Sequence, residues 1–501
     1  MNLFPARTSS VVCTCLLAAM VLLCACLPEE AVRPGTPSGG DTRTLSTPAA
    51  AATPLPTRLP IVPGQIMPYA AQSGDTLEAV AAHFNTTIAA IRGANPALPR
   101  KVSTLWPGQV LRVPTYFAPF TGTPFHILPD GEVVNGPPRA GWDLANEVAG
   151  KGGYLASFRA YTLGGFREGW QVVEKVAERY SVNPRLLLAL LEYRSSALTR
   201  GALTTQQVLF PLGTLDAEWK GLAGQLYWAS EMLNNGYYGW RDGSLQQIVL
   251  ADGRVTRPDP WQNAGTVAVQ YLLAQWFGQE QFDEAAGVQG FVLTYRALFG
   301  DPFVNDQALI PGDLTQPELA LPFEPGKVWA YTGGPHPTWG DSLPWGALDF
   351  APPSTVTGCI SSPEWVVAVA EGVVTRSELA TVVLDLDGDG DERTGWIVFY
   401  FHLETEGRVA QGTRVSRGDH LGHPSCEGGR ATGSHLHIAR RYNGEWIPAA
   451  GALPFTLSNW VAGSSGEAYL GTLTRFLDVI SACTCSTFAN QLALPPPSVP
   501  Q

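Results

Sequence analysis

Hydrophobic positions in the middle of the chain recur at helical spacing. An apolar stripe of this kind is formed by Val172, Val173, Val176, Ala177 and Tyr180. Asn183 and Pro184 then supply an N-cap and a first-turn proline for the apolar run 186–191. Further helices are expected at 222–234, 266–277 and 290–299. The pattern therefore predicts an α-helical domain over residues 142–303.

The last third of the chain has the pattern of strands instead. Runs of alternating, β-branched or aromatic residues are separated by turn residues, at 327–331, 366–370, 373–377, 381–386, 396–402 and 435–440. We therefore expect an all-β domain over residues 318–480, joined to the helices by a Pro-rich connection.

The first 26 residues have the pattern of an export signal. Arg7 is the only charged side chain before the apolar run 11–25, which is too short for a comfortable membrane span. The sequence Leu-Cys-Ala-Cys that ends at Cys26 resembles a bacterial lipobox, which implies that Cys26 is lipidated. An uncleaved helical anchor is the alternative, and in both cases the rest of the chain lies outside the cytoplasm. Residues 27–63, rich in Pro, Thr and Ala, are expected to be a flexible linker.

Residues 64–116 form a separate unit. A short strand and a turn around Tyr69 are followed by two segments of helical spacing and a closing strand over 105–114. This order resembles a LysM module, which implies a βααβ fold and binding of N-acetylglucosamine-containing glycans such as peptidoglycan. The resemblance implies that Asp75, Thr76 and Asn95 lie in the loops of the glycan groove. Capping of the first helix is the alternative for Asp75 and Thr76.

Composition narrows the class of protein. The chain has 501 residues, of which 45% are hydrophobic and 15% charged, so it is long enough for two to four domains with real cores. The formal net charge is −12, and no stripe of Lys and Arg is available to neutralise phosphates. We therefore expect no nucleic-acid partner.

Candidate chemistry gathers in the predicted β domain. His435 and His437 are one residue apart in the last predicted strand, so their side chains lie on one face of it. A catalytic zinc site uses three protein ligands and keeps one position for water, so further ligands are expected upstream. Candidates are His336 on a Gly/Pro loop, Asp349 in an apolar run, and His402 at the end of a strand.

These five residues, in this order, resemble the active-site set of the lysostaphin-like and beta-lytic zinc endopeptidases of bacterial cell walls. The longer spacing from His336 to Asp349, with the Gly-Gly-Pro-His lead-in, resembles the beta-lytic branch. The resemblance covers the last third of the chain. It implies an antiparallel sheet with a groove along one face.

The resemblance also implies a role for each residue. His336, Asp349 and His437 would bind one zinc ion, and His435 would be the general base. His402 would orient the water and stabilise the oxyanion. Tyr400 is expected on the same strand face as His402, as a further hydrogen-bond donor. Each residue taken singly has an ordinary structural explanation, and only the complete set in order favours a site.

The start of the helical domain resembles lytic transglycosylases and goose-type lysozymes, on Asn183, Pro184 and the leucines that follow. The place of their catalytic Glu is taken here by Arg194, which does not release its proton near neutral pH. Glu192 points to another side of the same helix. We therefore expect a degenerate, lysozyme-like domain that acts as a spacer or holds glycan.

Two further features concern metals and redox chemistry. Asp385, Asp387 and Asp389 have the spacing of a calcium loop, but Trp396 stands where an EF-hand has its bidentate Glu. An acidic hairpin turn is expected, with Ca²⁺ binding as the alternative. The cysteines of the β domain can form disulfides in three pairings, of which Cys359–Cys426 with Cys483–Cys485 is favoured.

The sequence thus predicts a multidomain zinc metalloendopeptidase that hydrolyses peptide bonds in peptidoglycan. It would be lipid-anchored in the bacterial cell envelope, outside the cytoplasm, and targeted by its LysM module. The alternative is a non-catalytic, peptidoglycan-binding lipoprotein that regulates another cell-wall hydrolase. A muramidase acting through the helical domain is disfavoured by Arg194.

Overall fold

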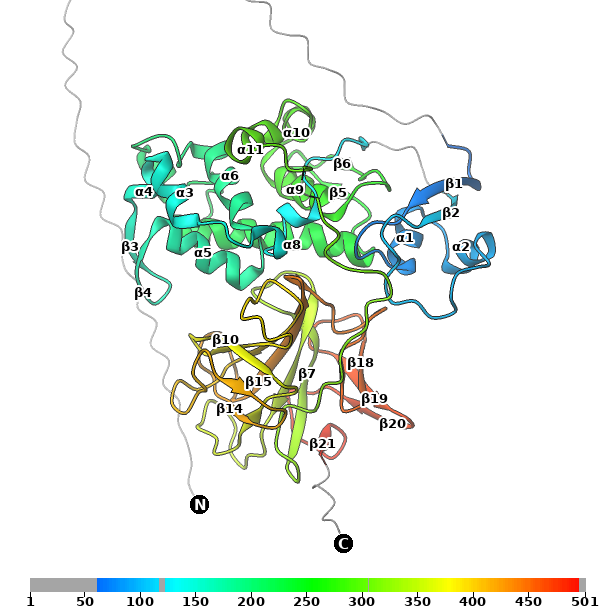
Figure 1. Ribbon diagram of the computed structural model, residues 1–501, viewed down its shortest axis with the longest axis vertical. Helices are drawn as coiled ribbons and strands as arrows, with labels where there is room; N and C mark the ends of the chain where they lie inside the picture. Colours follow the sequence, from blue (N-terminus) through cyan, green and yellow to red (C-terminus); the bar gives the residue numbers. More distant parts are fainter. Residues whose placement is uncertain (1–60, 117–121, 305, 495–501) are drawn as a thin grey trace, which may run out of the picture. The chain divides into compact units, whose positions relative to one another are not determined.

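The computed structural model describes residues 61–116, 122–304 and 306–494, shown in Figure 1. A βααβ unit, a set of helices and a β domain follow one another along the chain. Cys26 and most of the 27–63 linker lie outside the described residues, so the lipid anchor stays a prediction. Among the helices that are described, none has the length and apolar character needed to cross a bilayer.

The N-terminal unit has the predicted βααβ order. Its elements are β1 (Gln65–Ala70), α1 (Leu77–His83), α2 (Ile88–Ala94) and β2 (Val110–Thr115). The two strands pair antiparallel. Thr76 begins α1, because its side chain accepts a hydrogen bond from the backbone N–H of Ala79. A small core closes the unit and includes Tyr69, Val80, Phe84 and Leu111.

Residues 310–314 pack against this unit. The backbone N–H of Ile310 donates to Ser73 Oγ at 2.8 Å, and Thr104 Oγ1 donates to the carbonyl of Pro311 at 2.8 Å. Gly312 passes so close to Trp106 that a Cβ added there would lie 2.4 Å from the indole ring. The absence of a side chain at residue 312 is therefore what permits this contact.

The middle domain is helical, as predicted. Its helices are α3 (Leu144–Lys151), α4 (Tyr154–Ser157), α5 (Gly169–Tyr180), α6 (Pro184–Ser195), α7 (Thr205–Leu209), α8 (Gly221–Asp242), α9 (Ala264–Trp276), α10 (Gln279–Ala285) and α11 (Phe291–Phe299). Two short hairpins are β3 (Arg159–Thr162) with β4 (Gly165–Glu168), and β5 (Ile248–Val249) with β6 (Val255–Thr256). Asn183 caps α6 and Pro184 occupies its first turn. Helices α8 and α9 meet closely at Gly236, where a Cβ would lie 2.6 Å from that of Tyr271.

The C-terminal domain is built on a nine-stranded antiparallel sheet in the order β13-β10-β11-β12-β15-β8-β7-β21, with β16 paired to β15. The central strands are β10 (Gly372–Glu378), β11 (Thr381–Asp385), β12 (Trp396–Phe401), β15 (Leu436–Tyr442), β8 (Trp345–Ala351) and β7 (Val328–Pro337). Shorter strands at its margins are β13 (Arg414–Val415), β16 (Glu445–Trp446) and β21 (Gln491–Ala493).

Two smaller sheets complete this domain. The four-stranded one has the order β17 (Thr456–Leu457), β18 (Trp460–Ser464), β19 (Gly471–Arg475) and β20 (Asp478–Ser481). The other pairs β9 (Val366–Val367) with β14 (His420–Gly422). The expected strand 366–370 is thus shorter than the pattern predicted. The main sheet is covered on both faces, because Phe399 lies in the core that includes the helical domain and Tyr400 lies in the other core.

One prediction about the sheet is wrong. His336 was expected on a Gly/Pro loop, but β7 continues through the Gly-Gly-Pro segment and includes His336. The register of β7 against β8 shifts on either side of Gly333 and again at His336. Such irregularities let a strand pass through residues that weaken a regular ladder, and they re-aim its side chains.

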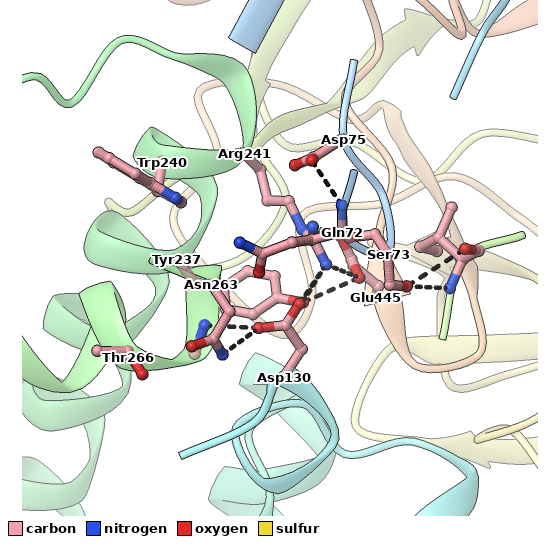
Figure 2. Close-up of polar contacts among 12 residues, drawn as sticks. Gln72, Ser73, Asp75, Asp130, Tyr237, Trp240, Arg241, Asn263, Thr266 and Glu445 are labelled. Carbon is pink, nitrogen blue, oxygen red and sulfur yellow. Dashed lines mark hydrogen bonds and ion pairs between the residues drawn. The ribbon is translucent and has the colours of Figure 1, made fainter. Parts of the chain in front are cut away.

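A buried polar cluster joins all three parts of the chain (Figure 2). Arg241 of α8 lies 2.9 Å from Asp130 Oδ2 and 2.9 Å from Glu445 Oε1 of β16. The same guanidinium donates to the backbone carbonyl of Ser73 in the βααβ unit, and Tyr237 donates to Glu445 Oε2 at 2.9 Å. Since these charges are nearly inaccessible to water, each depends on the others for compensation.

Candidate active site

Three adjacent strands bring the predicted metal ligands together. His437 of β15 pairs directly with Asp349 of β8, and Asp349 pairs on its other side with Gly333 of β7. His336 lies further along β7, beyond the register shift. The side chains of His336, Asp349 and His437 are all buried. The sheet register therefore builds the site from residues that are far apart in sequence.

The three potential ligand atoms are separated by the distances that one small metal ion requires. His336 Nε2 lies 3.3 Å from Asp349 Oδ1, and His437 Nδ1 lies 3.4 Å from the same oxygen. The two ring nitrogens are 3.0 Å apart. Ligands held at about 2.0–2.2 Å from a tetrahedral zinc ion are roughly 3.3–3.6 Å from one another. Two of the three separations lie in this range and the third is slightly shorter, so zinc fits with a small adjustment of the histidine rings.

The hydrogen bonds of the two histidines fix which nitrogen faces the site. His336 Nδ1 donates to the carbonyl of Gly334 at 2.8 Å, and His437 Nε2 donates to the carbonyl of Thr338 at 3.1 Å. A carbonyl only accepts, so His336 Nε2 and His437 Nδ1 carry lone pairs in the neutral rings. Among the described residues, Asp349 Oδ1 has no hydrogen-bond donor. Two lone pairs and a buried carboxylate oxygen that converge on one point fit a divalent cation.

The electrostatics support this arrangement. Burial would raise the pKa of Asp349, but His336, His435 and His437 hold this pKa well below its usual range. Burial lowers the pKa of His437. Burial would also lower the pKa of His336, and the Asp349 carboxylate more than offsets this effect. Asp349 is therefore ionised and His437 neutral at neutral pH, which are the forms that bind metal.

His435 and His402 lie beside this set, and each has one ring nitrogen available. His435 Nδ1 donates to the carbonyl of Gly433 at 2.8 Å, and its Nε2 lies 3.8 Å from Asp349 Oδ1. His402 Nδ1 donates to the carbonyl of Glu427 at 2.8 Å. The two rings are 4.6 Å apart between centroids. Burial and the neighbouring His435 and His437 lower the pKa of His402 to about 3.

Tyr400 does not share a face with His402, contrary to the prediction from strand alternation. His402 has a φ of +65°, which ends β12 and turns its ring toward Phe401 and His435. Tyr400 stays in the core on the other face, where its hydroxyl accepts a hydrogen bond from Val369 N at 2.9 Å. Backbone conformations of this kind are held by the surrounding structure and are frequent at functional sites.

Sequence reasoning missed the residues that support the ligands. Gly333 faces the Asp349 carboxylate, and a Cβ at this position would lie 2.4 Å from Oδ2. Tyr469 stacks on His336, with ring centroids 4.2 Å apart. Thr338 supplies the carbonyl that orients His437. The Gly-Gly lead-in could have indicated the close approach at Gly333, but nothing in the sequence pointed to Tyr469 or Thr338.

The site opens into a groove of about 1130 Å³. Its walls include Trp339 and Asp341 on one loop, Ser361 on another, and Arg430 on the loop before β15. The predicted disulfide Cys359–Cys426 is present and joins two of these loops. Cys483–Cys485, the other favoured bridge, is also formed. The volume of the groove slightly exceeds the roughly 300–1,000 Å³ of most small-molecule pockets.

The remaining predicted residues lie away from this groove. Asp75 is buried and accepts hydrogen bonds from Tyr69 and Gln72, and Asn95 bonds to the backbone of Arg112. Asp385 lies within 4.8 Å of the other two acids of its cluster, but it accepts backbone N–H groups from its own turn. The glycan-binding roles of Asp75, Thr76 and Asn95 stay predictions, and the Asp385 cluster has the hydrogen bonds of an acidic turn.

These features define the C-terminal domain as a zinc metallopeptidase. Comparison with known protein families matches residues 357–448 to Peptidase family M23, residues 126–311 to the LasA N-terminal domain and residues 69–114 to the LysM domain. The C-terminal domain is therefore an M23-type zinc metalloendopeptidase, and it follows segments that match a LysM domain and the LasA N-terminal domain. His402, His435 and His437 lie within the M23 match, whereas His336 and Asp349 precede it.

The chain is similar to several known proteins. Protease LasA from Pseudomonas aeruginosa is 26% identical over 316 residues, which cover 60% of this chain and 72% of that protein. A beta-lytic metalloendopeptidase from Lysobacter enzymogenes is 27% identical over 165 residues, which cover 32% of this chain and 86% of that protein. The solved structure of the M23 metalloprotease pseudoalterin is 25% identical, covers 34% of this chain and 96% of its own, and has a TM-score of 0.29.

Proposed function

We propose that this enzyme hydrolyses peptide bonds in peptidoglycan. His435 would be the general base, and His402 would orient the attacking water. The observation that carries the proposal is the position of His435, whose Nε2 lies 3.8 Å from Asp349 Oδ1 beside the ligand set. The complete set of three ligands and two histidines favours this function over a non-catalytic regulator. When bound, zinc supplies Lewis-acid chemistry and lowers the pKa of water at the site to about 7.

The hydrogen bond from His435 Nδ1 to Gly433 determines what this residue does. It leaves the lone pair of neutral His435 on Nε2, which can take a proton from an attacking water. The attack forms a bond between the water oxygen and the peptide carbonyl carbon. The proton on Nε2 then passes to the amine nitrogen as the C–N bond breaks, and His435 is neutral again.

The role of His402 also depends on which of its ring nitrogens is already hydrogen-bonded. Its Nδ1 is held by the carbonyl of Glu427, so Nε2 of the neutral ring accepts a hydrogen bond and can orient the attacking water. Stabilisation of an oxyanion requires a proton on this Nε2. Burial and the neighbouring His435 and His437 lower the pKa of His402 to about 3, which disfavours a proton on this Nε2. We therefore assign the orientation of water to His402 first.

The other domains would bring the substrate to this groove. The LysM domain would hold the glycan strand and so raise the local concentration of peptide cross-links. The helical domain would be a non-catalytic, degenerate copy of a lysozyme-like fold. In support, Arg194 donates to the carbonyl of Leu212 and lies over Trp276, and Glu192 accepts hydrogen bonds from Leu198 and Thr199.

The two disulfides accord with an extracytoplasmic protein, since such bonds persist in oxidising compartments. We further propose that the protein is anchored to the membrane by a lipid on Cys26, with residues 27–63 as the linker to the folded domains. Mass spectrometry of the mature N-terminus, made in a bacterial host that lipidates exported proteins, tests the anchor. A diacylglycerol on Cys26 is expected, and a free N-terminus further along the chain would refute the anchor alone.

The products of peptidoglycan digestion test the function. The purified protein, from residue 27 onward, should release new amino groups and no reducing sugar ends. Asp349→Asn should release neither, because it weakens a ligand. Exposed His420, whose Nε2 contacts Glu324 far from the ligand set, offers a control, and His420→Ala should digest normally. Reducing ends from the parent protein would show glycosidase activity instead.

A further inference from the structure

The loop between β7 and β8 carries a hydrogen bond on which a metal ligand depends. The carbonyl of Thr338 accepts a hydrogen bond from Nε2–H of His437. Nδ1 of the same ring therefore faces Asp349 and His336. Thr338 is 2% exposed and lies two residues after His336. Any shift of this loop therefore moves the group that sets the tautomer and the direction of a ligand.

The helical domain holds this loop by its backbone N–H groups. Asn235 Oδ1, on α8, accepts a hydrogen bond from Leu343 N at 3.0 Å. One turn earlier on α8, Glu231 Oε1 accepts from Asp341 N at 3.4 Å and from the hydroxyl of Tyr180 at 3.0 Å. The loop is thus fixed at two points by acceptors from a single helix.

Packing leaves this loop little freedom between those two points. Gly340 has a φ of +63°, and a Cβ there would lie 2.4 Å from Glu231 Oε1. Trp339 packs against Phe401 with centroids 4.8 Å apart, and the Arg179 guanidinium lies 5.5 Å from the centre of its indole ring. The loop therefore packs against side chains of α5 and α8.

We propose that Asn235 and Glu231 are positioning residues for the zinc site. By holding the loop, they keep the Thr338 carbonyl where it fixes the tautomer of His437. The described residues that line the groove all lie within 332–486, so the helical domain contributes none of them. The helical domain acts on the zinc site through this loop. The zinc affinity of the peptidase domain therefore depends on the helical domain. The inference rests on the zinc site of the proposed function.

Zinc affinity of the full extracytoplasmic chain tests this inference, measured by competition with a chelating dye. Loss of a group that orients a metal ligand costs about 10–100-fold in metal affinity, and a residue one step further out should cost less. We expect Asn235→Ala to weaken zinc binding by roughly three- to tenfold. Asn235→Asp keeps the acceptor oxygen and should restore the affinity. Glu231→Ala is a second, independent variant with the same expected direction.

Tyr238→Phe is the matched control. Tyr238 lies on the same helix, and its hydroxyl also accepts a backbone N–H of the peptidase domain, that of Trp446, at 2.9 Å. The control removes an equivalent hydrogen bond that does not involve the loop. It should therefore lower the thermal stability as Asn235→Ala does, but leave zinc affinity unchanged.

A second measurement reads the ring of His437 directly. ¹⁵N NMR of the metal-free protein should show the Nε2–H tautomer of His437 in the wild type, and a mixture in Asn235→Ala. The inference is overturned if Asn235→Ala binds zinc as tightly as the wild type, or if Tyr238→Phe loses the same affinity. Cleavage is scored separately. Zinc-loaded wild type that cuts no peptide bond would refute the proposed function. The zinc affinities of the variants would still test whether Asn235 and Glu231 position the zinc site.

Discussion

His435 and His437 approach the same oxygen of Asp349 through different ring nitrogens, Nε2 at 3.8 Å and Nδ1 at 3.4 Å. The other nitrogen of each ring donates to a backbone carbonyl, that of Gly433 for His435 and that of Thr338 for His437. Both side chains face Asp349, as period-two alternation predicts, although β15 itself begins at Leu436. In the proposed function, these different orientations let His437 bind the metal and leave His435 for proton transfer.

Substitution of these two histidines should therefore have separable effects. His435→Gln should keep stoichiometric zinc and lose about 10²–10⁴-fold in turnover, the usual contribution of a general base. His437→Ala should lose both zinc and activity. Metal analysis and peptide-cleavage rates on the same samples distinguish the two outcomes. Loss of zinc from His435→Gln would instead place His435 among the ligands.

Gly333→Ala should weaken zinc binding although it leaves all three metal ligands unsubstituted. The added Cβ would lie 2.4 Å from Asp349 Oδ2, so the carboxylate must move or rotate. We expect weaker zinc binding in a chelator titration, with the fold retained by circular dichroism. Gly201→Ala is the control, because nothing lies within 4 Å of a Cβ at Gly201. Equal zinc affinity in the two variants would contradict the crowding described for Gly333.

The Cys359–Cys426 bridge should matter more for turnover than for zinc. It closes a separation of 67 residues and joins loops of the groove, whereas the ligands lie on strands. The double variant Cys359→Ala/Cys426→Ala should lose up to about 4 kcal/mol of stability by the loop-entropy estimate. Zinc content should stay at the parent level while cleavage slows. Thermal unfolding and metal analysis check both parts, and an unchanged midpoint would speak against a structural role for the bridge.

Several features of this site could be predicted from the sequence. The ligand types and the pair His435 and His437 indicated zinc, and the order of all five residues indicated the fold through its resemblance to a known family. The positions of individual side chains did not follow. A strand pattern gives no sign that β7 passes through glycines by register shifts, or that His402 adopts a positive φ. Both depend on packing between strands that are distant in sequence.

Contacts between domains were also beyond sequence reasoning. Arg241, Asp130 and Glu445 are spread over more than three hundred residues, and no periodicity links them. Nothing in the pattern of α8 indicated that Asn235 faces a loop of the peptidase domain. Helical spacing predicts which face of a helix is buried, but not which domain covers it. The lipobox at Cys26 and the glycan contacts of the LysM domain stay predictions.

Arg241→Met should destabilise the protein by about 3–5 kcal/mol, the usual effect of removing one partner from a buried ion pair. The variant leaves Asp130 and Glu445 buried without their cation. Equilibrium denaturation at neutral pH measures the loss. A shift within about 0.5 kcal/mol, typical of surface substitutions, would mean that the cluster contributes little.

The same variant should respond to pH in a defined direction. Burial already raises the pKa of Glu445, which Arg241 opposes, so removal of Arg241 raises this pKa further. A carboxyl group whose pKa is higher in the folded state binds more protons when folded, so stability falls as pH rises through that range. The destabilisation by Arg241→Met should therefore shrink as the pH is lowered from about 7 to about 5. Denaturation curves at several pH values, with the wild type alongside, test this.

The most direct test of the metal site is zinc X-ray absorption spectroscopy on the purified protein from residue 27 onward, combined with metal analysis. We expect one zinc per chain with two imidazole nitrogens and a carboxylate oxygen as its protein ligands. Asp349→Ala should lose this spectrum, whereas Asp385→Ala should keep it. A chain that binds no zinc, or one whose zinc spectrum survives Asp349→Ala, would contradict the metal site on which the proposed mechanism depends.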